Sequence, residues 1–262
     1  MLKSLLHANS LKLEFIDGDY CKLSSTWKTD DFPYLFTRLY YIYEGGGQVS
    51  CGAETLPMKP GNLYLLPKDV PISYFCQDYM EQLYFHVTLT NLEGFDILGN
   101  IPKVCQLPCS REHLEMLKKL FMSPDYCDLL EFKMLVTRDI IQCFRNAELP
   151  AMATKSYSQD VLQAISYMQN NVNLQLTTNQ ISQAVFTSPN RLHKIFKAET
   201  GMTIGAYMDR LVFLRAAQLL KDPKLSIGEI SRQLGFCDQY YFSRRFKNRF
   251  GQTPSEFRRL RK

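Results

Sequence analysis

Apolar positions follow two different periods along the 262 residues of the chain. In the first part, short apolar runs alternate with turn-forming residues, and the aromatic-rich run 38–43 is predicted to end at the glycines 45–47. Further runs near Val49, at 63–66 and at 83–89 are separated by prolines, which suit turns and sheet edges. Short strands at this spacing are typical of a small β-barrel or sandwich.

From about residue 111 the apolar period becomes that of helices. Two helices are predicted, near 111–121 and 128–147. Their apolar faces consist of Leu114, Leu117, Leu120 and Phe121 in the first, and Phe132, Leu135, Val136, Ile140 and Phe144 in the second. Pro150 and the following residues up to Ser158 are typical of a linker. We therefore expect an α+β chain with an N-terminal domain over 1–150 and an all-α domain over 151–262.

The all-α part repeats one plan twice. The recurring residues are Ile181, Phe196 and Gly201 in the first copy, and Ile230, Phe246 and Gly251 in the second. The offset between the copies changes by one residue in the middle of the plan. This change falls in a turn between two helices, where length varies easily.

Residues that cap helices bound each copy. A Ser or Thr followed three residues later by Gln or Glu forms a capping box that begins a helix, and a left-handed glycine ends one. The predicted caps are Thr177 with Gln180, Ser188 with Pro189, and Gly201 in the first copy, and Ser226 with Glu229, Asp238 and Gly251 in the second. Each copy is therefore predicted to be a helix-turn-helix, whose second helix enters the major groove of double-stranded DNA.

Outward residues of the two second helices have side chains that suit DNA. Asn, Gln and Arg can form paired hydrogen bonds with bases, while Lys and Arg neutralise phosphates. The outward residues are Asn190, Arg191, His193, Lys194 and Lys197 in the first copy, and Gln239, Tyr240, Ser243, Arg244, Lys247 and Arg249 in the second. A connecting helix over 204–220 is expected to present both helices to successive grooves, about 34 Å apart.

The charge of the chain is unevenly divided. Residues 155–262 contain 17 Lys and Arg against 7 Asp and Glu, a net charge of +10, whereas residues 1–154 contain 14 against 19, a net charge of −5. This asymmetry favours a polyanion as the partner of the basic half. A helical bundle with a merely solvated basic surface would also be basic, but it would not need two copies of the same caps and turns.

The segment 161–262 resembles the DNA-binding domain of the AraC/XylS family of bacterial transcription regulators. The resemblance is most specific in the second copy, at Ile230, Gly235-Phe236, Asp238-Gln239, Tyr241-Phe242-Ser243-Arg244, Phe246-Lys247, Phe250-Gly251 and Thr253-Pro254-Ser255-Glu256-Phe257-Arg258. It implies a sequence-specific transcription regulator, such as an activator, that reads bases through Asn190, His193, Lys194, Gln239, Tyr240, Ser243 and Arg244. The first turn departs from the pattern, with Val185-Phe186 where the family often has a glycine.

The N-terminal half is similar, at 39–45 and 58–71, to the cupin-like β-barrel that is joined to this DNA-binding domain in the family. The resemblance implies a small-molecule effector bound in the barrel. Arg38 and Tyr40 share one strand face, and an inward guanidinium can hold a carboxylate, a phosphate or a sugar hydroxyl. Trp27 can stack on a flat or sugar-like ligand. The sequence leaves open which strand face points inward, and each of these residues also suits a structural role.

The sequence favours binding over catalysis in the barrel. The paired histidines of metal-dependent cupins are missing, and a single imidazole such as His86 cannot hold a metal without partners. His86 is therefore a candidate ligand contact or a strand histidine bonded within the fold. The eight cysteines contain no C-x-x-C pair, although Cys105 and Cys109 could form a redox or metal switch. We expect no catalytic residue, metal or cofactor, and no enzyme activity.

Three forms of control remain open: a small-molecule effector, a protein partner or cysteine oxidation without a ligand, and a cupin enzyme with a regulatory tail. The helices over 112–147 match the place where the family often dimerises, so we expect a homodimer, although packing on the barrel explains them equally well. With no run of eighteen apolar residues and no secretion signal, we expect a cytoplasmic protein without membrane contact.

Overall fold

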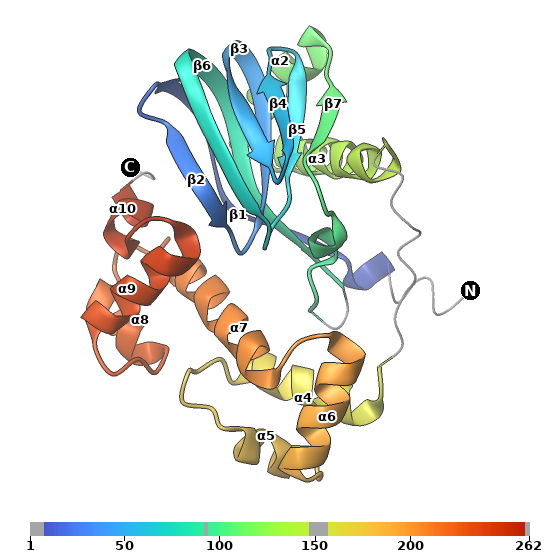
Figure 1. Cartoon of the computed structure of the whole chain (residues 1–262), viewed down its shortest axis with the longest axis vertical. Coiled ribbons are helices and arrows are strands. Elements are labelled where there is room, and N and C mark those ends of the chain that lie inside the picture. Colours follow the sequence, from blue (N-terminus) through green and yellow to red (C-terminus); the bar gives the residue numbers. More distant parts are fainter. Residues whose placement is uncertain (1–7, 92–93, 147–156, 260–262) are drawn as a thin grey trace. The chain divides into compact units, whose positions relative to one another are not determined.

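The computed structural model describes residues 8–91, 94–146 and 157–259. The chain divides into two compact units, Met1–Met152 and Ala153–Lys262. The predicted domain boundary after residue 150 and most of the predicted linker lie outside the described residues. Strands come first along the chain and helices follow, which confirms the predicted α+β class (Figure 1). Among the described residues, no helix combines the length and the apolar character needed to cross a membrane.

Two long strands organise the N-terminal unit. The strands are β1 (Lys12–Ser24), β2 (Lys28–Pro33), β3 (Thr37–Cys51), β4 (Glu54–Met58), β5 (Asn62–Leu66), β6 (Pro71–Thr90) and β7 (Cys105–Pro108). They form one sheet in the order β1-β6-β3-β5-β7, with β2 also on β6 and β4 also on β3. Antiparallel pairing of β3 with β6 runs from Thr37 opposite Val87 to Cys51 opposite Ile72. Each half of this β3–β6 ribbon therefore carries its own outer strands.

Glycines bend the β3–β6 ribbon. The prediction that the strand over 38–43 ends at the glycines is wrong, because β3 continues through them with a shift of register against β6. A Cβ atom on Gly45 would lie 2.0 Å from the carbonyl oxygen of Tyr79, and one on Gly47 would lie 2.2 Å from that of Phe75. Only glycine allows the two backbones to approach this closely, so these residues form a bulge within the strand.

Alternate residues of β3 enter two separate hydrophobic clusters. Leu39 and Tyr41 belong to a cluster that also contains residues of the following helices. Tyr40 and Ile42 belong to a second cluster on the other face of the strand, because successive side chains of a strand point to opposite faces. Arg38 shares the face of Tyr40. The sequence did not tell which face of this strand points where. In the structure, the face with Arg38 and Tyr40 points away from α2 and α3.

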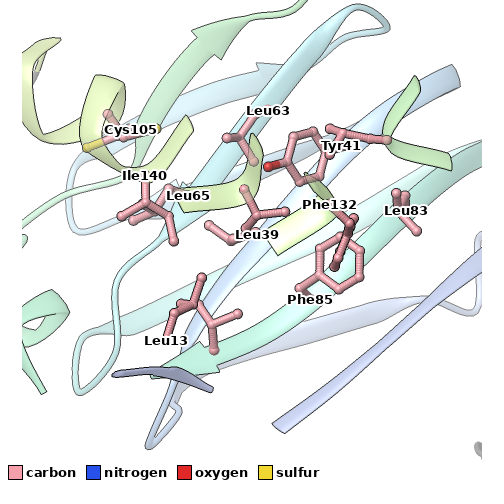
Figure 2. Close-up of a cluster of buried hydrophobic side chains, with 14 of the residues drawn as sticks. Leu13, Leu39, Tyr41, Leu63, Leu65, Leu83, Phe85, Cys105, Phe132 and Ile140 are labelled. Atoms are coloured by element: carbon pink, nitrogen blue, oxygen red, sulfur yellow. The ribbon is translucent and has the colours of Figure 1, made fainter. Parts of the chain in front are cut away.

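Helices α2 (Arg111–Phe121) and α3 (Tyr126–Asn146) cover one face of the sheet (Figure 2). The predicted apolar faces of both helices are confirmed. Leu114, Leu117, Leu120, Phe132, Val136 and Ile140 are buried in this cluster, and Phe121, Leu135 and Phe144 are partly buried against it. A short 3-10 helix, η1 (Ile97–Asn100), precedes β7 and contributes Leu98 to the same cluster.

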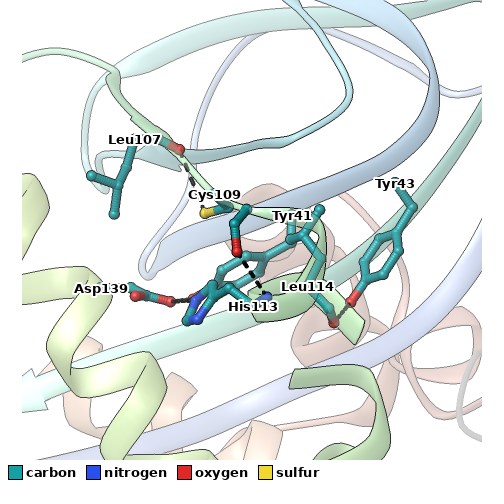
Figure 3. A network of polar contacts seen from close by, with 8 residues as sticks. Tyr41, Tyr43, Leu107, Cys109, His113, Leu114 and Asp139 are labelled. Atoms are coloured by element: carbon teal, nitrogen blue, oxygen red, sulfur yellow. Dashed lines mark hydrogen bonds and ion pairs between the residues drawn. The ribbon is translucent and has the colours of Figure 1, made fainter. Parts of the chain in front are cut away.

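A buried polar network joins β3 to both helices (Figure 3). Asp139 of α3 accepts a hydrogen bond of 2.9 Å from the hydroxyl of Tyr41, and its same oxygen lies 2.8 Å from Nε2 of His113 on α2. Burial, together with the nearby Asp139 carboxylate, holds the pKa of Tyr41 well above its usual value, so the hydroxyl stays a donor. The three side chains fix the helix pair against the strand.

The C-terminal unit is helical throughout. Its helices are α4 (Gln159–Asn170), α5 (Thr178–Ala184), α6 (Pro189–Thr200), α7 (Ile204–Leu219), α8 (Ile227–Gln233), α9 (Gln239–Phe250) and α10 (Pro254–Arg259). Phe213 of α7 is fully buried and contacts the rings of Phe236 and Phe246 in the second half of the unit. A backbone bond of 2.9 Å from Leu174 to Leu234 also links the halves.

Candidate nucleic-acid interface

Capping residues fix where the two helices of the first helix-turn-helix, α5 and α6, begin and end. Thr177 and Gln180 form both bonds of a capping box at the start of α5. At the start of α6, the side chain of Ser188 accepts from the backbone N–H of Arg191 and a proline occupies the first turn. Gly201 ends α6 with a left-handed φ of 76°. All of the caps predicted for this copy are confirmed.

The second helix-turn-helix, formed by α8 and α9, has the same construction. Ser226 and Glu229 form a capping box, and the carboxylate of Asp238 accepts a 2.7 Å bond from the N–H of Tyr241. These hydrogen bonds to backbone and side-chain donors lower the pKa values of both Glu229 and Asp238. Gly251 ends α9 with a φ of 72°. The predicted caps of this copy are confirmed as well.

The turns of the two copies are closed by equivalent bonds. The N–H of Thr187 donates to the carbonyl of Ser182 over 2.9 Å in the first turn, and that of Phe236 donates to Ser231 over 3.0 Å in the second. The residue before each donor has positive φ, 54° at Phe186 and 81° at Gly235. The departure from glycine in the first turn therefore leaves its geometry intact.

Helices α6 and α9 each bury one face and expose the other. Leu192 and Phe196 of α6 and Phe242, Phe246 and Phe250 of α9 are buried. The predicted DNA contacts are exposed, except that Ser243 is half-buried; they are Asn190, Arg191, His193, Lys194 and Lys197 on α6, and Gln239, Tyr240, Ser243, Arg244 and Lys247 on α9. Tyr240 is 86% exposed, which is unusual for an aromatic side chain of a compact unit. Both copies therefore present rows of polar and basic side chains to solvent.

Two of these candidates have partners within the unit. Arg191 forms an ion pair of 3.2 Å with Asp160 in the first turn of α4. The guanidinium of Arg244 lies 5.7 Å from the centre of the Tyr241 ring. Both contacts are at the surface, so phosphates or bases can replace them at small cost.

Arg249 is exposed, as the sequence predicts, but its guanidinium also has a partner within the unit. It forms an ion pair of 2.6 Å with Asp209 of α7, and Arg245 pairs with the other oxygen of the same carboxylate. Asp209 is only 8% exposed, and the two arginines lie one turn apart on α9. The pair therefore fixes α9 to α7. The sequence analysis did not identify the role of Asp209. The signal that could have found it is an acidic residue within the apolar run of α7.

In the N-terminal unit, Arg38 is fully buried. None of its three guanidinium nitrogens meets hydrogen-bond geometry with a described residue, although the Tyr40 hydroxyl lies close enough for the Arg38 charge to oppose the rise in its pKa. Its closest contact is the ring of Tyr34, whose centre lies 4.1 Å from the guanidinium carbon, and the ring of Tyr74 lies at 5.6 Å. Cation–π attraction offsets part of the cost of burying this charge, but it supplies no acceptor for the N–H groups.

Trp27 and Tyr40 lie in the same region as Arg38. The ring of Trp27 stacks on Tyr74 at 4.1 Å and meets Tyr40 edge-on at 5.6 Å. Burial raises the pKa of Tyr40 to about 12, so its hydroxyl is neutral at physiological pH. The structure thus brings three of the four predicted ligand residues together. Two tyrosines that the sequence did not identify lie beside them. We call this group the Arg38 cluster; it comprises Trp27, Tyr34, Arg38, Tyr40 and Tyr74.

His86 lies opposite Arg38 on β6. Its ring stacks on Phe36 at 4.5 Å, and its Nδ1 lies 3.8 Å from a carboxylate oxygen of Asp17. Across the described residues, no group of three or more His, Cys, Asp or Glu side chains has an arrangement that suits a metal ion. His86 therefore packs within the fold beside Arg38, with its ring on Phe36 and its Nδ1 near Asp17.

Burial sets the protonation state of Cys105 and Cys109, the two cysteines considered for a redox or metal switch. Burial raises the pKa of Cys109 to about 12, and that of Cys105 is raised for the same reason. Both thiols are therefore protonated at neutral pH, the form that reacts slowly with oxidants. This chemistry disfavours control through Cys105 and Cys109.

Comparisons with known proteins agree with the geometry of the C-terminal unit. A family model described as a helix-turn-helix domain matches residues 181–260. The Msm operon regulatory protein of Streptococcus mutans is 28% identical over 239 residues, which cover 84% of this chain and 83% of that protein. The transcriptional activator RhaR of Salmonella arizonae is 34% identical over 113 residues, 43% of this chain and 39% of its own.

The fold of the whole chain also has a solved counterpart. The structure of ToxT from Vibrio cholerae covers 95% of this chain and 98% of its own, with a TM-score of 0.62 and 15% sequence identity. This likeness concerns the fold alone. The two helix-turn-helix copies, the matching family model and the named regulators among the relatives lead to one conclusion: the chain is a DNA-binding transcription regulator with a helix-turn-helix unit of the AraC type.

Proposed function

We propose that this transcription regulator responds to a small molecule that carries a carboxylate, phosphate or hydroxyl group and binds at the Arg38 cluster. The observation that carries this proposal is the buried guanidinium of Arg38, whose nitrogens meet hydrogen-bond geometry with no described residue. A buried charge without hydrogen bonds is costly. A ligand oxygen would supply the missing acceptors, and a planar guanidinium suits paired bonds to such groups.

The aromatic residues of the cluster suit the rest of such a ligand. Trp27 and Tyr74 present stacked rings, and Tyr40 adds an edge beside them. Rings of this kind contact flat ligands and the apolar faces of sugars. The proposed role of the N-terminal unit is therefore binding rather than catalysis.

Named relatives are compatible with a ligand of this chemistry. Solved ToxT structures contain an unsaturated fatty acid or a naphthalenyl butenoic acid, both carboxylic acids. Another relative, 22% identical over 84% of this chain and 82% of its own, is the lactose operon transcription activator of Staphylococcus xylosus. A carboxylate and a sugar hydroxyl share the oxygen acceptors that Arg38 requires.

Trp27 allows a direct test, because it is the one tryptophan in the chain. Tryptophan fluorescence of the full chain should change in a saturable way with one member of a panel of sugars, sugar phosphates and carboxylic acids. The same compound should shift the affinity of the chain for its DNA site, since regulation requires different ligand affinities in the two DNA-binding states. A panel without any saturable response would contradict the effector proposal.

On the DNA side, we propose that the exposed rows of α6 and α9 read two half-sites about one helical turn apart. A selection of the full chain against randomised duplexes, at two salt concentrations, should enrich a two-part sequence. Uniform, salt-sensitive binding without an enriched sequence would reduce the C-terminal unit to a general polyanion-binding surface.

Two substitutions on α9 should separate base contact from phosphate contact. Arg244→Ala should cost about 1–3 kcal/mol at the selected site and relax the preference at one base pair. Lys247→Ala should weaken binding to all sequences alike and reduce the salt slope by about one unit. Fluorescence anisotropy with the selected and scrambled duplexes measures both. An equal loss on both duplexes for Arg244→Ala would reassign that residue to phosphate contact.

We also propose that two copies of the chain associate through α3. Tyr126, Leu130 and Met134 follow each other at four-residue intervals along α3 and are 87%, 61% and 65% exposed. An exposed apolar row at this spacing is typical of a helix that packs on another helix. Leu130→Glu together with Met134→Glu should convert a dimer into a monomer in sedimentation velocity, while Lys133→Glu on the same helix should not. A wild-type monomer at all concentrations would exclude the dimer.

A further inference from the structure

The turn that precedes α6 contains a strained residue. Phe186 has a left-handed backbone with φ of 54°, and its side chain is 96% exposed. A bulky side chain disfavours this conformation, which glycine adopts freely. The turn therefore contains both backbone strain and a phenyl ring in water. Local packing explains neither of these features.

The second copy shows that the turn does not need this side chain. Gly235 takes the equivalent position with φ of 81°, and the same backbone bond closes both turns. The two turns differ in the side chain at the left-handed position. Strained residues are concentrated at functional sites, where another requirement outweighs their cost. The exposed ring of Phe186 therefore suits a partner outside the folded unit.

The position of Phe186 points to DNA. It lies two residues before Ser188, which caps α6, and four before Asn190, the first exposed residue proposed to read bases. The start of a recognition helix lies at the edge of the major groove. At that edge the duplex offers apolar surface, namely thymine methyl groups and deoxyribose. A phenyl ring suits such surface and cannot form the hydrogen bonds that phosphates accept.

We propose that Phe186 contacts a thymine methyl or a deoxyribose at the edge of the half-site read by α6, and that it adds to affinity and sequence preference there. This proposal rests on the proposed reading of DNA by α6. The backbone strain at Phe186 is present in the free protein, and the contact that offsets its cost forms only when DNA binds. Gly235 leaves the second half-site without an equivalent contact.

Two substitutions of the full chain separate the ring from the strain. Phe186→Gly removes both, so it should raise the thermal midpoint of the C-terminal unit while weakening binding to the selected duplex by about tenfold, the effect of losing one buried aromatic contact. Phe186→Leu keeps the strain and an apolar side chain, so it should retain most of the affinity. Fluorescence anisotropy and thermal unfolding measure the two effects.

Other results would overturn the contact. Wild-type affinity of Phe186→Gly for the selected duplex would show that the ring does not touch DNA. Wild-type affinity combined with reduced transcription from a promoter with the selected site would assign the ring to a protein partner instead. Asn190→Ala distinguishes failure of the proposed function: if this variant also binds like wild type, α6 does not read bases, and the Phe186 contact fails with it.

Discussion

Replacing Arg38 with methionine should abolish the ligand response of Trp27 fluorescence and raise the thermal midpoint of the N-terminal unit. Methionine fills a similar length of space without a charge, and removal of a buried, unpaired cation should stabilise the unit by about 1–3 kcal/mol. Loss of the contact between the guanidinium and the Tyr34 ring, at 4.1 Å, offsets part of this gain. Stability and function therefore change in opposite directions.

Two further variants make this result specific. Arg38→Lys keeps the charge but not the planar pair of donors, so it should weaken binding of a carboxylate or phosphate ligand without abolishing it. Arg138→Met removes an exposed arginine of α3 and should leave both the ligand response and the midpoint unchanged. A lower midpoint of Arg38→Met with an intact ligand response would make Arg38 a structural residue.

Asp209→Ala should destabilise the C-terminal unit by about 2 kcal/mol, because it leaves two arginines of α9 without their carboxylate. The expected cost is below that of a fully buried pair, since the side chains of Arg245 and Arg249 are 27% and 45% exposed. Helix α9 also loses its fixed position on α7, so affinity for the selected duplex should fall by more than the loss of stability explains. Urea unfolding and anisotropy measure the two effects.

A double-mutant cycle tests whether Asp209 acts through the arginines. In a background with Arg245→Met and Arg249→Met, Asp209→Ala should cost much less than in the wild type, because residues that share one contact are not additive. Equal costs in the two backgrounds would mean that Asp209 stabilises α7 in some other way.

The helices of the C-terminal unit were predictable because their limits are local. Capping boxes span four residues, so Thr177 with Gln180 and Ser226 with Glu229 are visible in the sequence. The partners of Asp209 lie 36 and 40 residues away on another helix, and no periodicity predicts such a contact. The ion pair of Arg249, which is exposed as predicted, was missed for this reason.

The N-terminal unit was less predictable. Glycines end many strands, but those at 45–47 allow two long strands to bend together, and this depends on the backbone of β6. Alternation along β3 predicts that Arg38 and Tyr40 lie on one face of the strand and Tyr41 on the other. It does not predict which face points toward the helices. That direction depends on where α2 and α3 lie. Tyr34 and Tyr74 were missed because only the folded sheet brings them to Arg38.

The bond from Tyr41 to Asp139 is one contact through which the Arg38 cluster could act on the helix pair, and its strength limits what this contact can transmit. Tyr40 faces the cluster and the next residue bonds to α3, so a movement of β3 caused by the proposed ligand would reach the helices through this bond, beside the bond from Tyr43 to Leu114 and the apolar contacts of β3. A hydrogen bond to a charged group contributes about 1.5–3 kcal/mol. Transmission by this route alone therefore gives an induction ratio of roughly ten- to 150-fold at most. A measured ratio within that range needs no second route between the ligand and the helices.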